Sequence, residues 1–472
     1  MEVNHMLYSL THIRHKRNRR LLLAILLLSG LLSGCEGGTL ENSAAIPAGG
    51  SLSTVQFWEA TDLHYLDKSL HDGGSAFQSF VSSGDGKQLP YMDEILDAFV
   101  YEASIKKPDF IILSGDLTNN GERASHKSLA RKLARIEEKG TSVYVIPGNH
   151  DLFNPWARAF KGDRQIMTDS ITDKNFTEIY GRFGYDEALS RDRQSLSYAV
   201  RAAPGLWLLM IDSNQYDNNR RLGHPQTDGR VLPSTLAWID SCVQMAANEN
   251  ARVLTVMHHN ILDHSDIDIP GFKVNNSGQV LKKLQKNGLN LVLSGHIHMQ
   301  DIRHDLTDGG TEITDKTAVY DIATSALAVN PHQYGAMTFD PMSGRTTYQS
   351  TPVDVEGWAA SAGLTDSRLL SFKKYAEQSF IDDSYKKAYE SLKGSKFSDQ
   401  DKREMADAMA QLNVRYFAGT AGGGIDDLLK LPGFKLWSTV NDGFLPRYIR
   451  SMAQSKPLSN TSLEIILNRE QP

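Results

Sequence analysis

The sequence predicts an α/β protein followed by a smaller helical domain. From about residue 51 to 355, apolar runs typical of buried strands alternate with helical patterns, and amphipathic helices without strand alternation follow from about 356 to 472. The chain has 472 residues, of which 40% are hydrophobic and 22% charged, so it can form a sizeable core and two domains. We therefore expect a sheet-rich core with helices outside it over residues 51–355.

The first 34 residues have the order of an export signal. Basic residues between Arg14 and Arg20 precede an apolar stretch from Leu21 to Leu32, and Cys35 follows two small residues. This stretch of 12 residues is well short of the roughly 20 that a membrane-spanning helix needs. We expect a signal peptide over residues 1–34, and a flexible tether rich in Gly, Ser and Ala over residues 35–50.

The segment Leu32-Ser33-Gly34-Cys35 resembles the bacterial lipobox. That resemblance implies that Cys35 becomes lipidated and anchors the protein to the outer side of the cell membrane. Several acyl chains, at about 0.8 kcal/mol per buried methylene, would hold it there. The alternative is a plain secretory signal with an incidental Cys. Only Cys242 then remains, which excludes a disulfide framework.

The mature chain is acidic. The formal net charge of −6 includes the signal, and without residues 1–34 there remain 45 basic and 55 acidic residues, a charge of −10. This balance argues against a nucleic-acid polymer as the partner, because it offers no excess of phosphate-neutralising groups. Small phosphorylated substrates remain compatible, since bound metals can supply positive charge locally.

The pattern of apolar residues predicts the order of the strands and helices. The apolar runs at residues 55–58, 110–113, 143–146, 253–256 and 291–293 read as strands, and shorter strands are expected at 318–322 and 334–339. Apolar residues recur at helical spacing over 92–100, 129–136, 236–243 and 280–284, and the second and fourth of these faces precede Gly140 and Gly288 as plausible caps.

Each of the five longer apolar runs is followed by an island of metal-binding residue types. The islands are Asp62-Leu63-His64, Gly115-Asp116, Gly148-Asn149-His150-Asp151, His258-His259 and Gly295-His296-Ile297-His298. In open α/β sheets, ligands collect at the carboxyl ends of the strands. Groups that are far apart in the sequence can therefore meet in one cleft.

The residue types suit a centre with two metal ions. Asp62 and His64 are two positions apart, so in an extended segment both side chains point the same way, and the same holds for His296 and His298. Asp116 has two oxygens and can bridge two cations. Two divalent ions about 3.5–4 Å apart could lower the pKa of a shared water and clamp the attacking and leaving oxygens at phosphorus.

The islands, in this order, resemble the motifs of the calcineurin-like metallophosphoesterase superfamily. The resemblance covers Asp62 to His298 and implies a β-sandwich flanked by helices, with residues 51–355 as the catalytic domain. It implies that one metal binds Asp62, His64, Asp116 and His298, and that the other binds Asp116, Asn149, His258 and His296. His258 is preferred to His259 because it follows its strand directly, as the family's single His does. Nitrogen and oxygen ligands without a thiolate suit Fe, Mn or Zn.

The resemblance gives His150 a catalytic role. It implies that His150 donates to the phosphoryl oxygen or leaving group, and that Asp151 or another carboxylate orients its ring. The remaining histidines of this region are expected at the surface or in loops: His71, His126, His224, His264, His304 and His332. Among these, His264 and His332 could line the cleft, and Asn119 and Asn120 could touch the substrate.

The region after residue 355 reads as helical. Apolar residues mark one helix near 369–375 and a second near 405–412, which opens with a capping box at Ser398 to Asp401 and ends near Gly419. The region is either a helical domain packed on the core or a lid that shapes the substrate cleft.

The motif details resemble the branch of the superfamily that contains class III cyclic nucleotide phosphodiesterases, and a lipoprotein with a helical extension resembles firmicute members of that kind. This predicts a metal-dependent phosphodiesterase outside the cytoplasmic membrane, which hydrolyses small diesters such as cyclic nucleotides through a metal-bridging hydroxide. One alternative is a phosphomonoesterase or nucleotidase with the same metals, because the pocket walls decide between them. The other is a non-enzymatic surface lipoprotein that captures a metal or ligand.

Overall fold

The computed structural model describes residues 53–267, 269–305, 318–421, 425–440, 443–453 and 459–469. Residues 53–472 form one compact unit. The expected signal peptide, the tether and Cys35 lie outside the described residues and stay predictions. Among the described residues, no helix is both long enough and apolar enough to cross a membrane.

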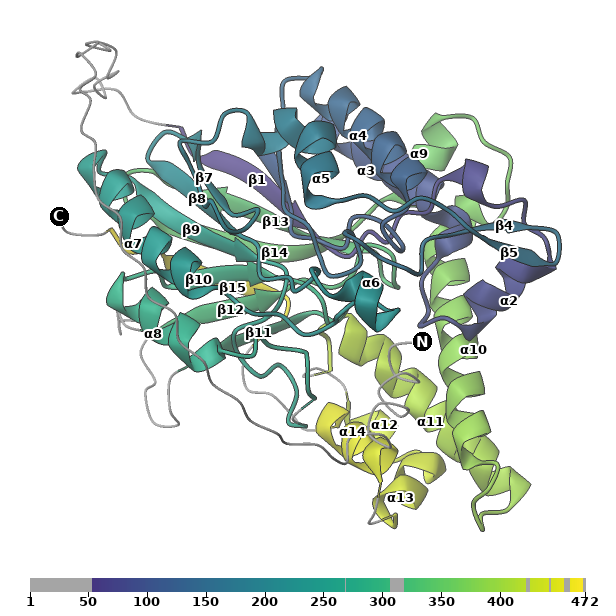
Figure 1. Ribbon diagram of the computed structural model, residues 1–472. Helices are drawn as coiled ribbons and strands as arrows, with labels where there is room; N and C mark the ends of the chain where they lie inside the picture. The colour runs from purple at the N-terminus through teal and green to yellow at the C-terminus, as the bar shows by residue number, and fades with distance from the viewer. Residues whose placement is uncertain are drawn as a thin grey trace, which may run out of the picture. The chain divides into compact units, whose positions relative to one another are not determined.

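Two mixed β-sheets form the centre of this unit (Figure 1). The six-stranded sheet has the order β15-β14-β13-β1-β2-β3, with β1 at Val55–Ala60, β2 at Phe110–Leu113, β3 at Ser142–Val145, β13 at Gln333–Phe339, β14 at Arg345–Pro352 and β15 at Ser462–Ile466. The seven-stranded sheet has the order β11-β12-β10-β9-β8-β7-β6, with β6 at Ser190–Arg191, β7 at Tyr198–Ala203, β8 at Leu206–Ile211, β9 at Arg252–Met257, β10 at Leu291–Ser294, β11 at Asp301–His304 and β12 at Tyr320–Ala323. A separate hairpin pairs β4 (Arg158–Lys161) with β5 (Arg164–Met167).

Helices cover the outer faces of the two sheets. One apolar core contains residues of both sheets together with those of α3 (Met92–Lys106) and α4 (Arg123–Glu137). A second lies between the seven-stranded sheet and helices α7 (Pro233–Asn248) and α8 (Ser277–Lys286). Three shorter helices are α2 (Ser75–Ser83), α5 (Asp173–Tyr180) and α6 (Asn219–Leu222). The predicted β-sandwich flanked by helices is thereby confirmed.

Parallel pairing brings the five islands together. Strands β1, β2 and β3 run parallel to one another, and so do β9 and β10 of the other sheet. Each island begins within three residues of the end of its strand, as expected from the apolar runs. The carboxyl ends of parallel strands share one edge, so the islands of each sheet meet there.

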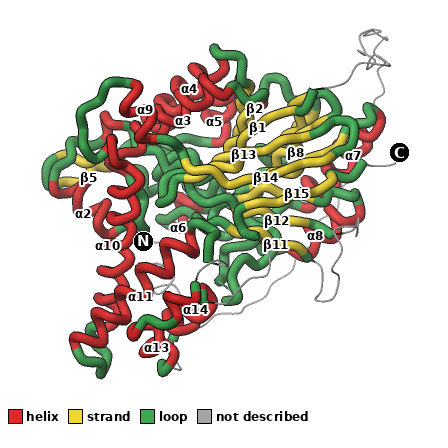
Figure 2. Tube along the Cα trace, turned by 180° about the vertical axis from the view of Figure 1, so that it is seen from behind, coloured by secondary structure: helices red, strands yellow, loops and turns green. Residues whose placement is uncertain are grey.

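The region after residue 355 is helical, as predicted. It comprises α9 (Val355–Ser361), α10 (Phe372–Leu392), α11 (Asp399–Phe417), α12 (Asp426–Leu429), α13 (Pro432–Ser438) and α14 (Phe444–Met452), and Figure 2 shows α10, α11, α13 and α14 to one side of the two sheets. The predicted capping box is present, because Ser398 and Asp401 each bond to the other's backbone N–H.

One strand of this region was not predicted. Strand β15 pairs antiparallel with β14 and forms the edge of the six-stranded sheet. It has five residues, so the alternation of Leu463 and Ile465 is too short to distinguish a strand from a loop. The helical region is consequently joined to this sheet at both of its ends.

A buried ion-pair network fixes the loop after β9 to the seven-stranded sheet. His264 Nδ1 lies 3.1 Å from Asp301 Oδ2, and His264 Nε2 lies 3.3 Å from Asp321 Oδ2. Asp321, on β12, also accepts hydrogen bonds from the backbone N–H groups of Ile261 and Leu262. Burial would lower the pKa of His264, but the Asp321 and Asp301 carboxylates outweigh it and raise the pKa to about 9.

We predict that this network makes stability depend on pH. A pKa raised from 6.5 to about 9 means that the stabilisation is fully present below pH 6.5 and is lost as the pH rises through about 9. The loss should reach at most about 3 kcal/mol, and His264→Gln should not show it. Unfolding free energies of both proteins between pH 6 and 9.5 test this, and parallel pH curves would contradict it.

Candidate metal centre

The backbone turns sharply at most of the predicted metal ligands. Five of the seven have a positive φ, between 43° and 71°: Asp62, His64, Asp116, His296 and His298. A left-handed conformation costs a non-glycine residue roughly 1–2 kcal/mol. At these residues it lets the backbone turn away abruptly after the strand, so that the side chain is directed across the edge of the sheet.

Two island glycines permit the close approach of neighbouring islands. A Cβ atom at Gly148 would overlap the backbone N of Asp116, and one at Gly295 would overlap the side chain of Thr61. These contacts are between backbone or short side chains, which cannot move aside. Glycine is therefore required at both positions for the islands to meet.

A first cluster of ligand atoms comes from Asp62, His64 and His298, which are all buried. One ligand atom of each lies within 4.8 Å of those of the other two. The Nε2 atoms of His64 and His298 are 3.0 Å apart. Asp62 Oδ1 lies 3.7 Å from the former and 3.4 Å from the latter.

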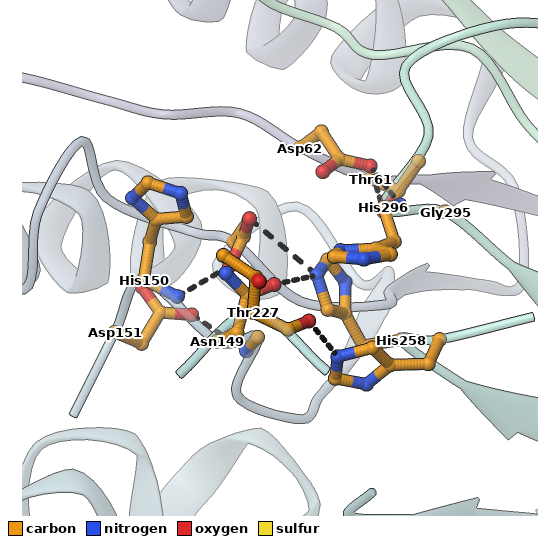
Figure 3. A network of polar contacts seen from close by, with 12 residues as sticks. Thr61, Asp62, Asn149, His150, Asp151, Thr227, His258, Gly295 and His296 are labelled. Atoms are coloured by element: carbon orange, nitrogen blue, oxygen red, sulfur yellow. Dashed lines mark hydrogen bonds and ion pairs between the residues drawn. The ribbon is translucent and has the colours of Figure 1, made fainter. Parts of the chain in front are cut away.

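A second cluster comes from Asp116, His258 and His296, whose ligand atoms also lie within 4.8 Å of one another. Figure 3 shows the amide of Asn149 beside His258, whose Nε2 lies 3.1 Å from Asn149 Oδ1 and 3.4 Å from Asp116 Oδ2. The other ring nitrogen of His258 lies 3.0 Å from the Ser114 carbonyl oxygen and donates to it. This bond directs Nε2 at the cluster, as the ring nitrogen that is available to a metal ion.

Asp116 belongs to the second cluster and also faces the first. Its Oδ2 is 3.7 Å from His64 Nε2 in the first cluster and 3.4 Å from His258 Nε2 in the second. Its Oδ1 accepts a hydrogen bond of 2.8 Å from the backbone N–H of His150. One carboxylate oxygen is thus fixed by the protein, and the other faces both clusters.

The donor set fits two metal ions. Nitrogen and oxygen atoms that can bind a cation face one another at 3.0–3.1 Å, in the pairs His64–His298 and His258–Asn149. Within the described residues, Asp62 Oδ1 is buried without a hydrogen-bond partner. Buried acceptors in such contact are stable only when a cation or proton is shared between them. All are nitrogen or oxygen, which suits Mn, Fe or Zn.

The ionisation of these groups also favours cations. Burial would raise the pKa of Asp62, but the rings of His298 and His64 outweigh it and hold that pKa well below its usual range. Burial and the nearby Lys87 ammonium lower the pKa of His64 to about 4. For His258, burial is outweighed by Asp116, which raises the pKa to about 9. A cation at the second cluster would take the place of that proton.

His259 lies outside the clusters of ligand atoms. Its Nδ1 is 2.8 Å from the Ser213 hydroxyl, and its Nε2 is 3.0 Å from the Thr227 carbonyl oxygen. Burial, followed by the neighbouring His296 and His258, lowers its pKa well below the usual value, so the ring is neutral. Both nitrogens serve the protein's own hydrogen bonds, which leaves His258 as the ligand-type His of this island.

The His150 ring is oriented by asparagines, and not by Asp151 as expected. His150 Nδ1 lies 3.0 Å from both the Asn119 carbonyl oxygen and Asn120 Oδ1, so this nitrogen carries a proton. The Asp151 carboxylate instead accepts hydrogen bonds from the backbone N–H groups of Leu117, Thr118 and Gly148. Asp151 therefore connects two islands, and Asn119 and Asn120 hold the His150 ring in place.

His126 is buried in a helix, contrary to the surface or loop position expected for it, whereas His264 and His332 lie in loops as expected and are buried there. His126, on α4, lies with Nε2 3.1 Å from the Asp151 carbonyl oxygen and Nδ1 2.9 Å from the Tyr180 hydroxyl. Its position three residues before Leu129 continues the apolar face of that helix, so the helical spacing could have revealed its burial. His224 is exposed, as predicted.

Asp85 lies beside the metal centre, although no feature of the sequence indicates this. Its Oδ2 lies 3.7 Å from Nδ1 of His298 and 3.2 Å from Nζ of Lys87. A carboxylate beside the second nitrogen of a ligand His is a common support for metal binding. Asp85 sits between two glycines in a turn, where neither periodicity nor a motif marks it.

Two family models match the chain. One, described as calcineurin-like phosphoesterase, matches residues 55–300. The other, described as the C-terminal domain of cyclic nucleotide phosphodiesterase, matches residues 354–457. The two matches leave only residues 301–353 between them.

Individual proteins are similar at lower identity. A probable cyclic nucleotide phosphodiesterase of a Synechococcus strain is 25% identical over 42% of this chain and 61% of its own. A manganese-dependent ADP-ribose/CDP-alcohol diphosphatase of Xenopus laevis is 25% identical over 41% of this chain and 62% of its own. The chain thus spans about six tenths of these relatives. A dimetal phosphatase of Danio rerio superposes with a TM-score of 0.43 at 14% identity, over 63% of this chain and 96% of its own.

We predict that Asp116→Asn lowers the metal content at both clusters, because one oxygen of Asp116 faces each of them. Metal analysis after dialysis against buffered Mn²⁺ should give fewer than one ion per chain, against two for the wild type. His224→Ala, at an exposed position, is the matched control and should keep both ions. Retention of two ions by Asp116→Asn would contradict the bridging role.

Proposed function

Since the chain belongs to the calcineurin-like phosphoesterase family, we propose that it is a phosphodiesterase that uses two metal ions to hydrolyse small phosphodiesters, with cyclic nucleotides as the preferred class. The similarity of both its regions to cyclic nucleotide phosphodiesterases supports this substrate class. The proposal includes attachment to the outer side of the cell membrane through Cys35. Recovery of a Cys35→Ser variant in the membrane fraction would argue against that attachment.

The observation that supports the proposal most directly is the position of Asp116, which lies close to both clusters and to the backbone of His150. One carboxylate oxygen faces a ligand nitrogen of each cluster, and the other binds the backbone N–H of His150. A phosphoryl group held by both clusters would therefore lie beside the His150 side chain. When bound, two metal ions would supply the positive charge that activates a water and stabilises negative charge on the phosphoryl oxygens.

The chain's own contribution to the reaction is the placement of a proton. Because Nδ1 of His150 donates to the Asn119 carbonyl oxygen and Asn120 Oδ1, the ring gains or releases its second proton at Nε2. A proton delivered from Nε2 to the leaving oxygen would prevent an alkoxide from forming. The ring of His150 lies 5.0 Å from that of His64, at the edge of the first cluster.

The substrate class can be tested with two model esters and a small panel. We expect Mn²⁺-loaded protein to cleave bis-p-nitrophenyl phosphate with a higher kcat/KM than p-nitrophenyl phosphate. Faster cleavage of the monoester would favour the phosphomonoesterase alternative. The panel should contain 2′,3′- and 3′,5′-cyclic nucleotides and ADP-ribose, because one relative is named for a diphosphatase activity. Metal binding without cleavage of any of these would favour a non-enzymatic role.

We predict that His150→Ala lowers kcat by roughly 10²–10⁴-fold, as for a lost general acid, and keeps both metal ions. Asn120→Ala should cause a smaller loss of the same kind, because the Asn119 carbonyl still holds the ring. Steady-state kinetics and metal analysis of the same samples test both variants. Equal loss of metal in His150→Ala and Asp116→Asn would show that the roles are assigned wrongly.

A further inference from the structure

We propose that the C-terminal helical region positions two of the metal ligands, so that its packing against residues 295–300 sets the affinity for both ions. These residues, which we name the ligand loop, carry His296 and His298 between β10 and β11. The inference rests on the metal centre of the proposed function, but not on which phosphoester is hydrolysed.

In the ligand loop, residues that supply ligand atoms alternate with residues that are buried against the helices. His296 and His298 supply ligand atoms, whereas Ile297 and Met299 have exposures of 7% and 4% and belong to the apolar core of the helical region. The helical residues of that core include Ala388 and Leu392 of α10, Met405, Met409, Leu412 and Tyr416 of α11, Trp437 of α13, and Ile449 and Met452 of α14. A shift of these helices would therefore move the backbone on which both ligands lie.

Hydrogen bonds fix the end of the ligand loop to α11, to the segment before β15 and to β14. The backbone N–H of Gln300 donates to the carbonyl oxygen of Phe417 at 3.0 Å. Phe417 is the last residue of α11, where carbonyl groups have no partner within the helix. The Gln300 side chain donates to the Asn460 carbonyl oxygen at 2.9 Å and accepts from the Tyr348 hydroxyl at 2.8 Å. All three bonds converge on a residue two positions after His298.

An electrostatic interaction through Asp85 links α10 to the same ligand. Asp85 Oδ2 lies 3.7 Å from His298 Nδ1, and the Asp85 carboxylate also acts electrostatically on Lys387 of α10. Phe380 of α10 packs against Ala326 and Val329. The Ala326 backbone N–H donates to the His298 carbonyl oxygen at 3.2 Å, so α10 supports the ligand loop from a second side.

The backbone of the ligand loop requires such support. His296 and His298 have φ values of 71° and 62°, and a left-handed conformation at a residue other than glycine persists only where the surroundings impose it. Without the helices, relaxation of these residues toward negative φ would turn the two rings away. Because His298 belongs to the first cluster and His296 to the second, both ions would be affected.

The test compares metal affinity in four full-length variants: Met299→Ala, Gln300→Ala, Val243→Ala and Met299→Leu. Met299→Ala removes the apolar contact, and Gln300→Ala removes two side-chain bonds without emptying the apolar core. Val243→Ala is the matched control, since Val243 is 5% exposed on α7 in the separate core of the seven-stranded sheet. Mn²⁺ affinity by equilibrium dialysis and Tm by circular dichroism are measured on each, at a temperature where all are folded.

We expect Met299→Ala and Gln300→Ala to bind Mn²⁺ about 10-fold more weakly, as for the loss of groups that orient metal ligands. Met299→Leu should restore the affinity, and Val243→Ala should lower Tm but keep wild-type affinity. Unchanged affinity in both loop variants would overturn the inference, and so would an equal loss in Val243→Ala. If the wild type binds two ions but cleaves no phosphoester, the proposed function is wrong. The Mn²⁺ affinities of the variants would still test the role of the helical region in that case.

Discussion

The crowding of buried acceptor atoms is the constraint on which the site depends. Nε2 atoms of His64 and His298 face each other at 3.0 Å, with Asp62 Oδ1 at 3.4 Å from the second of them. Such atoms repel unless a cation or a proton lies between them, so the protein must hold them in place from behind. Backbone N–H groups provide this support, since that of His296 binds Asp62 Oδ2 and that of His150 binds Asp116 Oδ1. The left-handed turns and the glycines of the islands follow from the need to bring these donors and acceptors together.

Much of this arrangement could be predicted because its signals are local. The apolar runs and the islands after them located the strands and the ligand-type residues, and the order of the islands indicated the family. The role of Asp151 could not be predicted, since two of its three backbone donors, Leu117 and Thr118, come from another loop that only the fold brings to it. The same holds for Asp85, which reaches His298 across more than two hundred positions, and for the asparagines behind His150.

The helical region shows which features can be predicted from residue spacing and which cannot. Amphipathic spacing predicted its helices and the capping box at Ser398, because both depend on neighbours in the sequence. Whether the region packs on the core or serves as a lid depends on contacts between distant segments. The structure shows packing: Ile297 and Met299 are buried among these helices, and Gln300 is bonded to the end of α11. A region attached so firmly beside two ligands belongs to the architecture of the site.

The pairing of β14 with β15 has a consequence for how the chain folds. Residues 353–461 separate the two strands, so β14 emerges from the ribosome well before its partner exists. Until then its outer N–H and C=O groups form an open edge, which other chains can pair with. The six-stranded sheet can therefore be completed only late, when β15 has been synthesised. The pairing of strands so far apart in the sequence also slows folding. A chain that stalls at this stage would be exposed to aggregation, and a chaperone that shields the β14 edge would raise the yield of native protein.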